Sequence, residues 1–198
     1  RFCNKEGLKL RRKRLHFGLV FQSFNLFPQY TALENVTLAR KLMAKGGKTG
    51  ERLEDIRREG EALLAQMGLQ DRMGNYPHQL SGGQQQRVAF ARALVMGQEI
   101  LLLDEPNSAL DFDNTSLLFH RLRELVETGE RTALIVLHDP ALALRWCGRL
   151  LLLDGGRLVE DVATEGMGPE ALQAVLGRLY PTIQVRRDEG GRFYCLPD

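Results

Sequence analysis

The sequence has few cysteines and no long apolar segment. Its three cysteines, Cys3, Cys147 and Cys195, are an odd number and lack the spacing of metal ligands. This usage favours a reduced cytosolic setting over a disulfide framework. No apolar run approaches the length needed to span a bilayer, and no signal-peptide pattern is present. These absences argue against a small secreted scaffold and against a membrane-spanning chain.

A strong charge imbalance is also lacking. The 198 residues include 27 Lys and Arg against 25 Asp and Glu, a net charge of +2. Such a balance does not favour nucleic acid or a membrane surface as partner. The basic run at residues 11–14 is a local exception, which we interpret as a solvated strand edge rather than a binding patch. The length suits one domain with a real core.

A complete phosphate-binding loop is the third absence. The stretch AKGGKTG contains the triplet GKT at residues 47–49, but the motif G-x-x-x-x-G-K-[ST] requires glycine where Leu42 stands. The motif also follows a strand, whereas the residues before this triplet show a helical pattern. We therefore interpret the triplet as a loop between two helices.

Short apolar runs predict the strands. They are FGLVFQ (17–22), EILLLDEP (99–106) and TALIVLHDP (132–140). The second and third are continuous rather than alternating in hydrophobicity, which is typical of strands buried on both faces. Because helical patterns lie between the strands, the sequence predicts an α/β fold with a mainly parallel sheet.

Periodicity and capping residues predict the helices. Residues 51–67 form an amphipathic pattern that Thr49 could cap at its start and Gly68 at its end. Towards the C-terminus, residues 149–161 predict a hairpin with an Asp-Gly-Gly turn. Pro169 then opens a last amphipathic helix.

Polar side chains stand where the predicted strands end. Gln22 ends the first, Asp104 and Glu105 end the second, and His138 ends the third. Ligands of open α/β sheets bind at these carboxyl ends. One carboxylate could hold a hydrated Mg²⁺ and the next could activate a water. The alternatives stay open: paired acids also start helices, and a lone histidine is often structural.

Ser81, Gly82 and Gly83 precede a long segment of helix-forming residues. Unpaired N–H groups at a helix N-terminus bind phosphate, and glycines let the anion approach the backbone. An ordinary loop and helix cap is the alternative interpretation.

Taken together, these motifs resemble the ATP-binding subunit of an ABC transporter. LSGGQQQR (80–87) is similar to the signature motif of that family and ILLLDEP (100–106) to its Walker B motif. SALD (108–111) is similar to the D-loop, VFQ to the Q-loop and VLHD to the H-loop. The resemblance runs from about Phe17 to Glu160. It implies a P-loop NTPase-like fold over residues 1–198, with a helical subdomain at about 28–95 and a C-terminal hairpin plus helix at about 148–198.

The resemblance implies a role for each residue at the strand ends. Asp104 would serve Mg²⁺, and Glu105 would be the general base. His138 would contact the γ-phosphate of ATP. Gln22 would link the metal site to the membrane subunit.

The resemblance also implies a site shared between two subunits. Ser81, Gly82 and Gly83, with Gln84 beside them, would bind the γ-phosphate of the ATP that the opposite subunit holds. Asp111 would help to join the two sites.

This sequence departs from the family pattern in several places. Asn107 stands where threonine is usual, Phe112 where proline is common, and Leu137 where threonine often precedes the histidine. The residues before Gln22 contain none of the strand, adenine-stacking aromatic residue and P-loop that the family places there. We therefore expect a piece of a complete subunit of about 240 to 250 residues, a one-domain size. A partner subunit that lacks the P-loop is the alternative.

The implied function is that of an importer subunit on the cytoplasmic face of the membrane. Its partners would be permease subunits, contacted through residues 28–35, and a second ATP-binding subunit, with no nucleic acid. The segment around the Q-loop resembles polar amino-acid importers, whereas the C-terminal tail is more similar to iron-chelate and vitamin B12 importers. The favoured interpretation is an importer of polar amino acids, with the iron-chelate and vitamin B12 importers as the alternative. ABC ATPases of DNA repair place long coiled coils between the Q-loop and the signature, and no sustained heptad is present here.

Overall fold

A computed structural model of the chain describes residues 16–47, 49–129 and 131–196. These fall into two compact units, and the boundary in the sequence lies between Val136 and Leu137. Each unit is described by itself. Cys3, the basic run at 11–14 and Lys48 of the GKT triplet lie outside the described residues. Within the described ranges, no helix is both long and apolar enough to span a bilayer.

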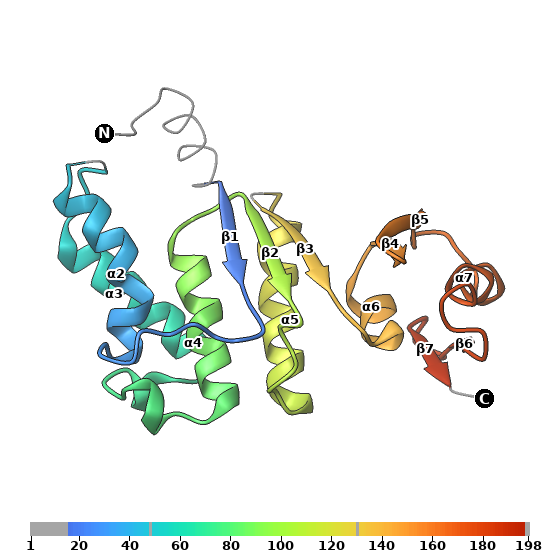
Figure 1. Ribbon diagram of the computed structural model, residues 1–198, viewed down its shortest axis with the longest axis horizontal. Coiled ribbons are helices and arrows are strands. Elements are labelled where there is room, and N and C mark those ends of the chain that lie inside the picture. Colours follow the sequence, from blue (N-terminus) through green and yellow to red (C-terminus); the bar gives the residue numbers. More distant parts are fainter. Residues whose placement is uncertain (1–15, 48, 130, 197–198) are drawn as a thin grey trace. The chain divides into compact units, whose positions relative to one another are not determined.

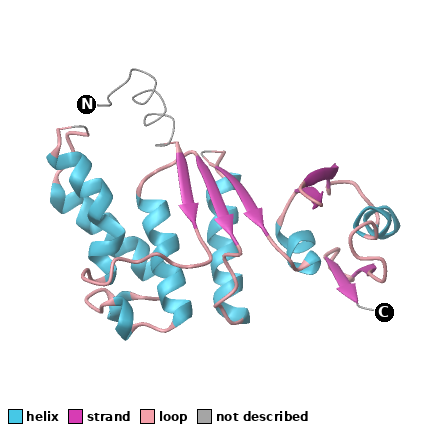
Figure 2. Cartoon of the chain, in the orientation of Figure 1, coloured by secondary structure: helices cyan, strands magenta, loops and turns pink. Residues whose placement is uncertain are grey.

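The first unit contains a parallel sheet of three strands in the order β1-β2-β3. Figure 1 shows the helices of this unit beside and behind the strands, and Figure 2 shows the same alternation of strand and helix. The prediction of a mainly parallel sheet with flanking helices is confirmed. The elements are β1 (Phe17–Val20), α2 (Ala32–Lys45), α3 (Leu53–Gln66), the 3-10 turns η1 (Gln70–Arg72) and η2 (Pro77–Gln79), α4 (Gly82–Val95), β2 (Ile100–Asp104), α5 (Phe112–Glu127) and β3 (Thr132–Val136).

One face of this sheet forms the core with α4 and α5. Val20, Leu101 and Leu103 are buried on that face, because side chains alternate between the two faces of a strand. Leu118 of α5 is fully buried, as is Phe90 of α4. Helix α4 is buried along most of its length, so its position is fixed by packing on several sides.

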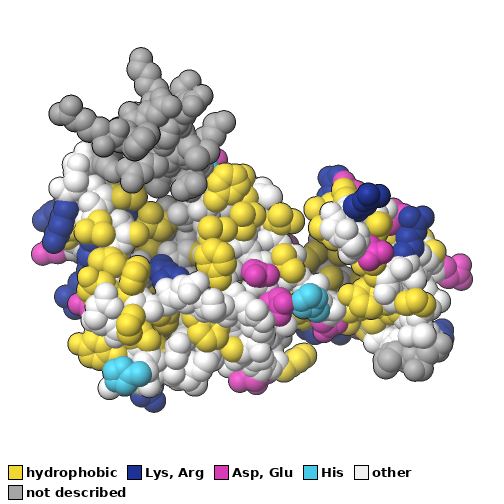
Figure 3. Space-filling view, viewed as in Figure 1, with side chains coloured by type: hydrophobic (Ala, Val, Ile, Leu, Met, Phe, Trp, Pro, Cys, Tyr) yellow, Lys and Arg dark blue, Asp and Glu magenta, His cyan; other side chains and the backbone are white. Residues whose placement is uncertain are grey.

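The other face of the sheet is largely exposed in the described part of the chain. Leu19, Leu134 and Val136 are 48%, 50% and 49% exposed, and Figure 3 shows hydrophobic side chains gathered over the strands. The prediction that the second and third strands are buried on both faces is therefore wrong for the described residues. Continuous apolar runs are typical of parallel strands whose two faces are both covered. Here the described helices cover one face only.

The start of α3 differs from the expectation. Its N-cap is Arg52, with no side-chain cap, so the prediction of Thr49 is wrong. Glu51, which precedes the helix, pairs with Arg40 of α2. At the other end, Gly68 has φ +66°, the left-handed conformation that commonly follows a helix, as predicted.

The described residues of the second unit form two antiparallel hairpins and two short helices. The predicted hairpin over 149–161 and the helix from Pro169 are confirmed, whereas β6 and β7 were not predicted. The core joins buried side chains of α6, β4, α7 and β6, among them Leu144, Leu150 and Leu172. The elements are α6 (Pro140–Trp146), β4 (Arg149–Asp154), β5 (Arg157–Ala163), α7 (Pro169–Leu176), β6 (Gln184–Arg187) and β7 (Phe193–Leu196). The subdomain boundaries at 28–95 and 148–198 remain predictions.

Candidate functional site

Two of the predicted site residues meet where β1 and β2 end. The amide Nε2 of Gln22 donates a hydrogen bond to Oε2 of Glu105 at 3.2 Å. The two residues are far apart in the sequence, but parallel strands place their carboxyl ends at one edge of a sheet. The N–H of Glu105 also donates to the carbonyl oxygen of Val136 at 3.2 Å, which ties this residue to the end of β3. The predicted grouping of polar residues at this edge is therefore present for Gln22 and Glu105, with Asp104 exposed as the last residue of β2.

Glu105 has an unusual backbone. Its φ is +45°, in the left-handed region that side chains other than those of Gly, Asn and Asp rarely adopt. Such a conformation costs about 1 to 3 kcal/mol and persists where the surrounding structure fixes it. The following turn contributes, since the N–H of Ser108 donates to the Glu105 carbonyl oxygen at 3.1 Å. We call residues 105–110 the catalytic loop, after the role that the family resemblance predicts for Glu105.

A capping box starts α4. The hydroxyl of Ser81 accepts a hydrogen bond from the N–H of Gln84 at 3.3 Å, and the side-chain oxygen of Gln84 accepts one from the N–H of Ser81 at 2.9 Å. The predicted helix start at Ser81 is therefore confirmed. Both side chains are engaged in capping the helix. The first N–H groups of a helix lack partners within it. Those groups, at Gly82 and Gly83, could bind an anion.

The two glycines pack closely against the catalytic loop. A Cβ on Gly83 would lie 2.9 Å from the carbonyl oxygen of Ala109, and one on Gly82 would lie 3.6 Å from the Ala109 Cβ. Only glycine allows the Gly83 approach without a shift. The start of α4 and the catalytic loop are thus in direct contact within one chain.

Asp111 ends this region by capping α5. Its carboxylate accepts hydrogen bonds from the backbone N–H of Asn114 at 2.8 Å and from the Asn114 side chain. These bonds lower the pKa of Asp111, and the nearby Arg87 guanidinium adds a smaller effect in the same direction. Burial lowers the pKa of Arg87 itself.

Helix α4 also contacts the segment that follows Gln22. Arg92 donates to the carbonyl oxygens of Asn25 at 2.7 Å and Phe24 at 3.0 Å, and burial lowers its pKa. Asn25 has φ +47°, so Arg92 holds a second left-handed residue near the site. Sequence reasoning missed this contact, although an arginine within a helix that is otherwise mostly apolar is a recognisable signal.

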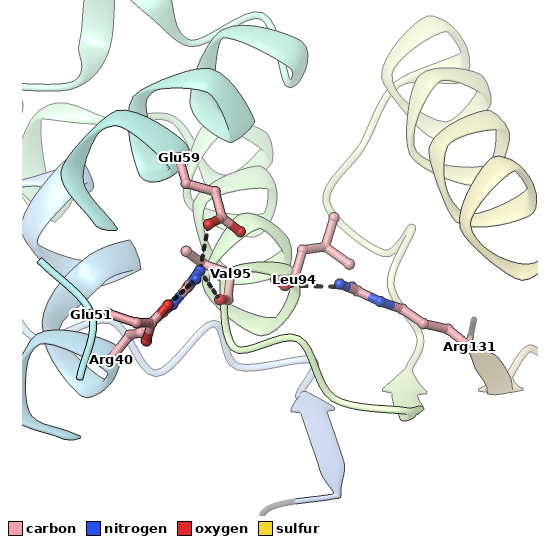
Figure 4. Close-up of polar contacts among 6 residues, drawn as sticks. All are labelled: Arg40, Glu51, Glu59, Leu94, Val95 and Arg131. Carbon is pink, nitrogen blue, oxygen red and sulfur yellow. Dashed lines mark hydrogen bonds and ion pairs between the residues drawn. The ribbon is translucent and has the colours of Figure 1, made fainter. Parts of the chain in front are cut away.

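Two arginines from other elements hold the C-terminal end of α4 (Figure 4). Arg40 of α2 donates to the carbonyl oxygen of Val95 at 2.9 Å and pairs with Glu51 and Glu59. Arg131 donates to the carbonyl oxygen of Leu94 at 3.4 Å. Positive charge at a helix C-terminus is favourable because the last carbonyls carry partial negative charge. Hydrogen bonds therefore fix the helix at both ends.

His138 belongs to the second unit and is described within it. It is exposed, and its carbonyl oxygen accepts a hydrogen bond from the Tyr180 hydroxyl at 3.2 Å. Asp139 follows and caps α6 by accepting from the N–H groups of Ala141 and Leu142. The role of His138 remains a prediction.

The donors at the strand ends suit Mg²⁺. That ion keeps several waters and takes one or two carboxylates rather than a cage of protein ligands. Among the described residues no cluster of three or more His, Cys, Asp or Glu side chains could hold a metal. The exposed carboxylate of Asp104, with Gln22 nearby on the adjacent strand end, fits the sparser coordination.

Comparisons with known proteins agree with one another. A family model described as "ABC transporter" matches residues 4–108. The L-cystine transport system ATP-binding protein TcyN of Escherichia coli is 42% identical over 167 residues, which cover 84% of this chain and 64% of the relative. The glutamine transport ATP-binding protein GlnQ of the same species is 45% identical over 163 residues, covering 79% and 65%. The arginine transport ATP-binding protein ArtM of Bacillus subtilis is 43% identical, covering 75% and 59%.

A solved structure matches the fold. The dimeric post-hydrolysis state of the ATP-binding cassette MJ0796 bound to ADP and Pi superposes with a TM-score of 0.71 at 36% identity, covering 84% of this chain and 70% of the other. The chain spans less than two thirds of the length of the curated relatives given above.

Proposed function

We propose, since the chain belongs to the ABC transporter family, that it acts as the ATP-binding subunit of a bacterial importer. Two such subunits would bind and hydrolyse ATP together and drive a permease in the membrane. The observation that carries this proposal is the hydrogen bond between Gln22 and Glu105 at the carboxyl ends of β1 and β2. It joins the candidate base to the residue that would link the metal site to the membrane subunit, at the edge where ligands of such sheets bind.

The roles of the site residues come from the resemblance to the family, and the contact between Gln22 and Glu105 supports them. Glu105 would accept a proton from the attacking water, a task that suits a carboxylate fixed by its surroundings. Asp104 and Gln22 would hold Mg²⁺, which neutralises charge on the phosphates when bound. His138 would contact the γ-phosphate.

The start of α4 would complete the site of a second subunit. Its capped N-terminus presents backbone N–H groups and a favourable dipole for a phosphate. Ser81 and the glycines at 82 and 83 would therefore contact the γ-phosphate bound by the partner. The similar cassette structure is described as a dimer, which supports this arrangement.

The permease would dock on the loop that precedes α2. The Asn35 side chain, which is buried, accepts from the N–H of Phe27 at 2.8 Å and donates to the carbonyl oxygens of Phe27, Tyr30 and Thr31. This network shapes the loop in advance, while Phe27 is 45% exposed. A preformed loop with an exposed aromatic residue suits a protein contact. The subunit would thus be held at the cytoplasmic face of the membrane through the permease.

The transported class follows from the relatives. They are named as cystine, glutamine and arginine transport proteins, so we propose a polar amino acid as substrate of the whole transporter. The iron-chelate alternative, suggested by the C-terminal tail, has no support among these names.

The test is ATP hydrolysis by the subunit expressed from its complete gene, with Glu105→Gln as the matched variant. We expect the wild type to hydrolyse ATP and the variant to lose nearly all turnover. The variant should also accumulate an ATP-bound dimer, which size-exclusion chromatography detects. Unchanged turnover in the variant would remove Glu105 as general base. No hydrolysis by the wild type would contradict the proposed function itself.

A further inference from the structure

Gln86 is a polar side chain buried in the apolar face of α4. It is 0% exposed, and it shares its helix face with Phe90 and Ala93, which follow at helical spacing and are also buried. An amide loses free energy when it is buried unless hydrogen bonds replace those to water. Its partners therefore show what the residue does.

Both ends of the Gln86 amide bind the backbone of the catalytic loop. Nε2 donates to the carbonyl oxygen of Glu105 at 3.3 Å, and Oε1 accepts from the N–H of Ala109 at 3.2 Å. A single side chain thus bridges the first part and the last part of the loop.

The loop requires such support because of its backbone at Glu105. With φ at +45°, this residue relaxes towards ordinary conformations unless its neighbours prevent it. Its N–H is held by Val136 and its carbonyl oxygen by Ser108 and Gln86. Of these partners, Gln86 alone acts through a side chain, so mutation can remove it without altering the backbone.

We propose that Gln86 is a positioning residue for ATP hydrolysis. It fixes the carboxylate of Glu105 through the backbone of the catalytic loop. It also connects that loop to α4, whose Ser81 end would contact the nucleotide of the opposite site. Gln86 thereby links the two ATP sites of the dimer within each subunit. This inference rests on the proposed function.

The decisive variant is Gln86→Met, which has a similar volume and no amide. We expect kcat for ATP hydrolysis to fall by about ten- to a hundredfold, with KM for ATP within about twofold of the wild type, because a misplaced group slows the chemical step more than binding. In a Glu105→Gln background, the same change should leave ATP-dependent dimer formation intact. A merely structural role would change stability and dimerisation instead.

Thr37→Val is the matched control. Thr37 is also 0% exposed, and its hydroxyl donates to the carbonyl oxygen of Leu33 within its own helix, away from the catalytic loop. This isosteric variant should keep the wild-type kcat and so show that losing a buried polar group does not by itself slow hydrolysis.

Gln86→Glu provides a second variant if the methionine protein does not fold. Burial raises the pKa of a carboxyl group, and its protonated form can both donate and accept as the amide does. Its kcat relative to the wild type should therefore decline as pH rises from about 6 to 8.5. A parallel pH profile, or an unchanged kcat in Gln86→Met, would overturn the inference while leaving the proposed function standing. Absence of hydrolysis in the wild type would overturn both.

Discussion

Replacing Gly83 by alanine tests the contact between the start of α4 and the catalytic loop. The added Cβ would lie 2.9 Å from the Ala109 carbonyl oxygen and 3.4 Å from the Leu110 Cδ2. Because the first contact is to backbone, the loop or the helix must shift, at a cost of about 1 to 3 kcal/mol for overpacking. The higher helix propensity of alanine returns at most about 1 kcal/mol. We expect a net loss of stability, measured as a lower Tm by circular dichroism without nucleotide.

Gly82→Ala is the control for this experiment. Its Cβ would meet the Ala109 Cβ at 3.6 Å, an ordinary contact, while the change in propensity is similar. The two variants should differ by about 1 to 3 kcal/mol, since only the Gly83 change carries the overpacking cost. Equal Tm values would refute the close approach of α4 to the loop.

Three further predictions concern the ends of helices. Ser81→Arg should keep the fold, lower its stability by about 0.5 to 2 kcal/mol because the helix cap is lost, and prevent ATP-dependent dimerisation, which size-exclusion chromatography measures; a dimer that still forms would contradict the contact with the partner's nucleotide. Because hydrogen bonds from Asn114 lower the pKa of Asp111 in the folded state, its stabilisation is present above the ordinary value of about 3.9 and is lost as pH falls through the folded pKa. The wild type should accordingly lose more Tm between pH 5 and 3 than Asp111→Asn, and equal losses would argue against the cap. Arg40→Met should cost about 1 to 2 kcal/mol in urea unfolding, because it leaves Glu51 and the end of α4 without their partner; no loss would mean that water replaces the arginine.

The sequence predicted those features that depend on local chemistry. Ser81 before a run of helix-forming residues predicted a helix start, and the structure has that start, closed by a capping box. The apolar runs at β1 and β2 predicted strands because they are rich in residues that favour strands. The meeting of Gln22 and Glu105 followed from one rule about parallel strands.

Features that depend on long-range contacts were not predicted. The bridge from Gln86 to Glu105 arises only when α4 packs against the sheet, and the sequence shows merely a polar residue on an apolar helix face. The left-handed conformation of Glu105 leaves no local signal, since glutamate rarely adopts it. Thr49 looked like a helix cap, but α3 begins after Arg52, and Glu51 instead pairs with Arg40 of α2.

The central claim is that two copies of this subunit complete each other's ATP sites. Mixing Ser81→Arg with Glu105→Gln subunits tests it directly, because each variant is expected to be inactive alone. In a mixed dimer, one site combines the intact Glu105 of the first variant with the intact Ser81 of the second. The mixture should regain ATP hydrolysis, up to about a quarter of the wild-type rate, which is the value for random pairing through a symmetric interface. If the mixture stays as inactive as its separate components, the two residues do not act across a shared site and the account is contradicted.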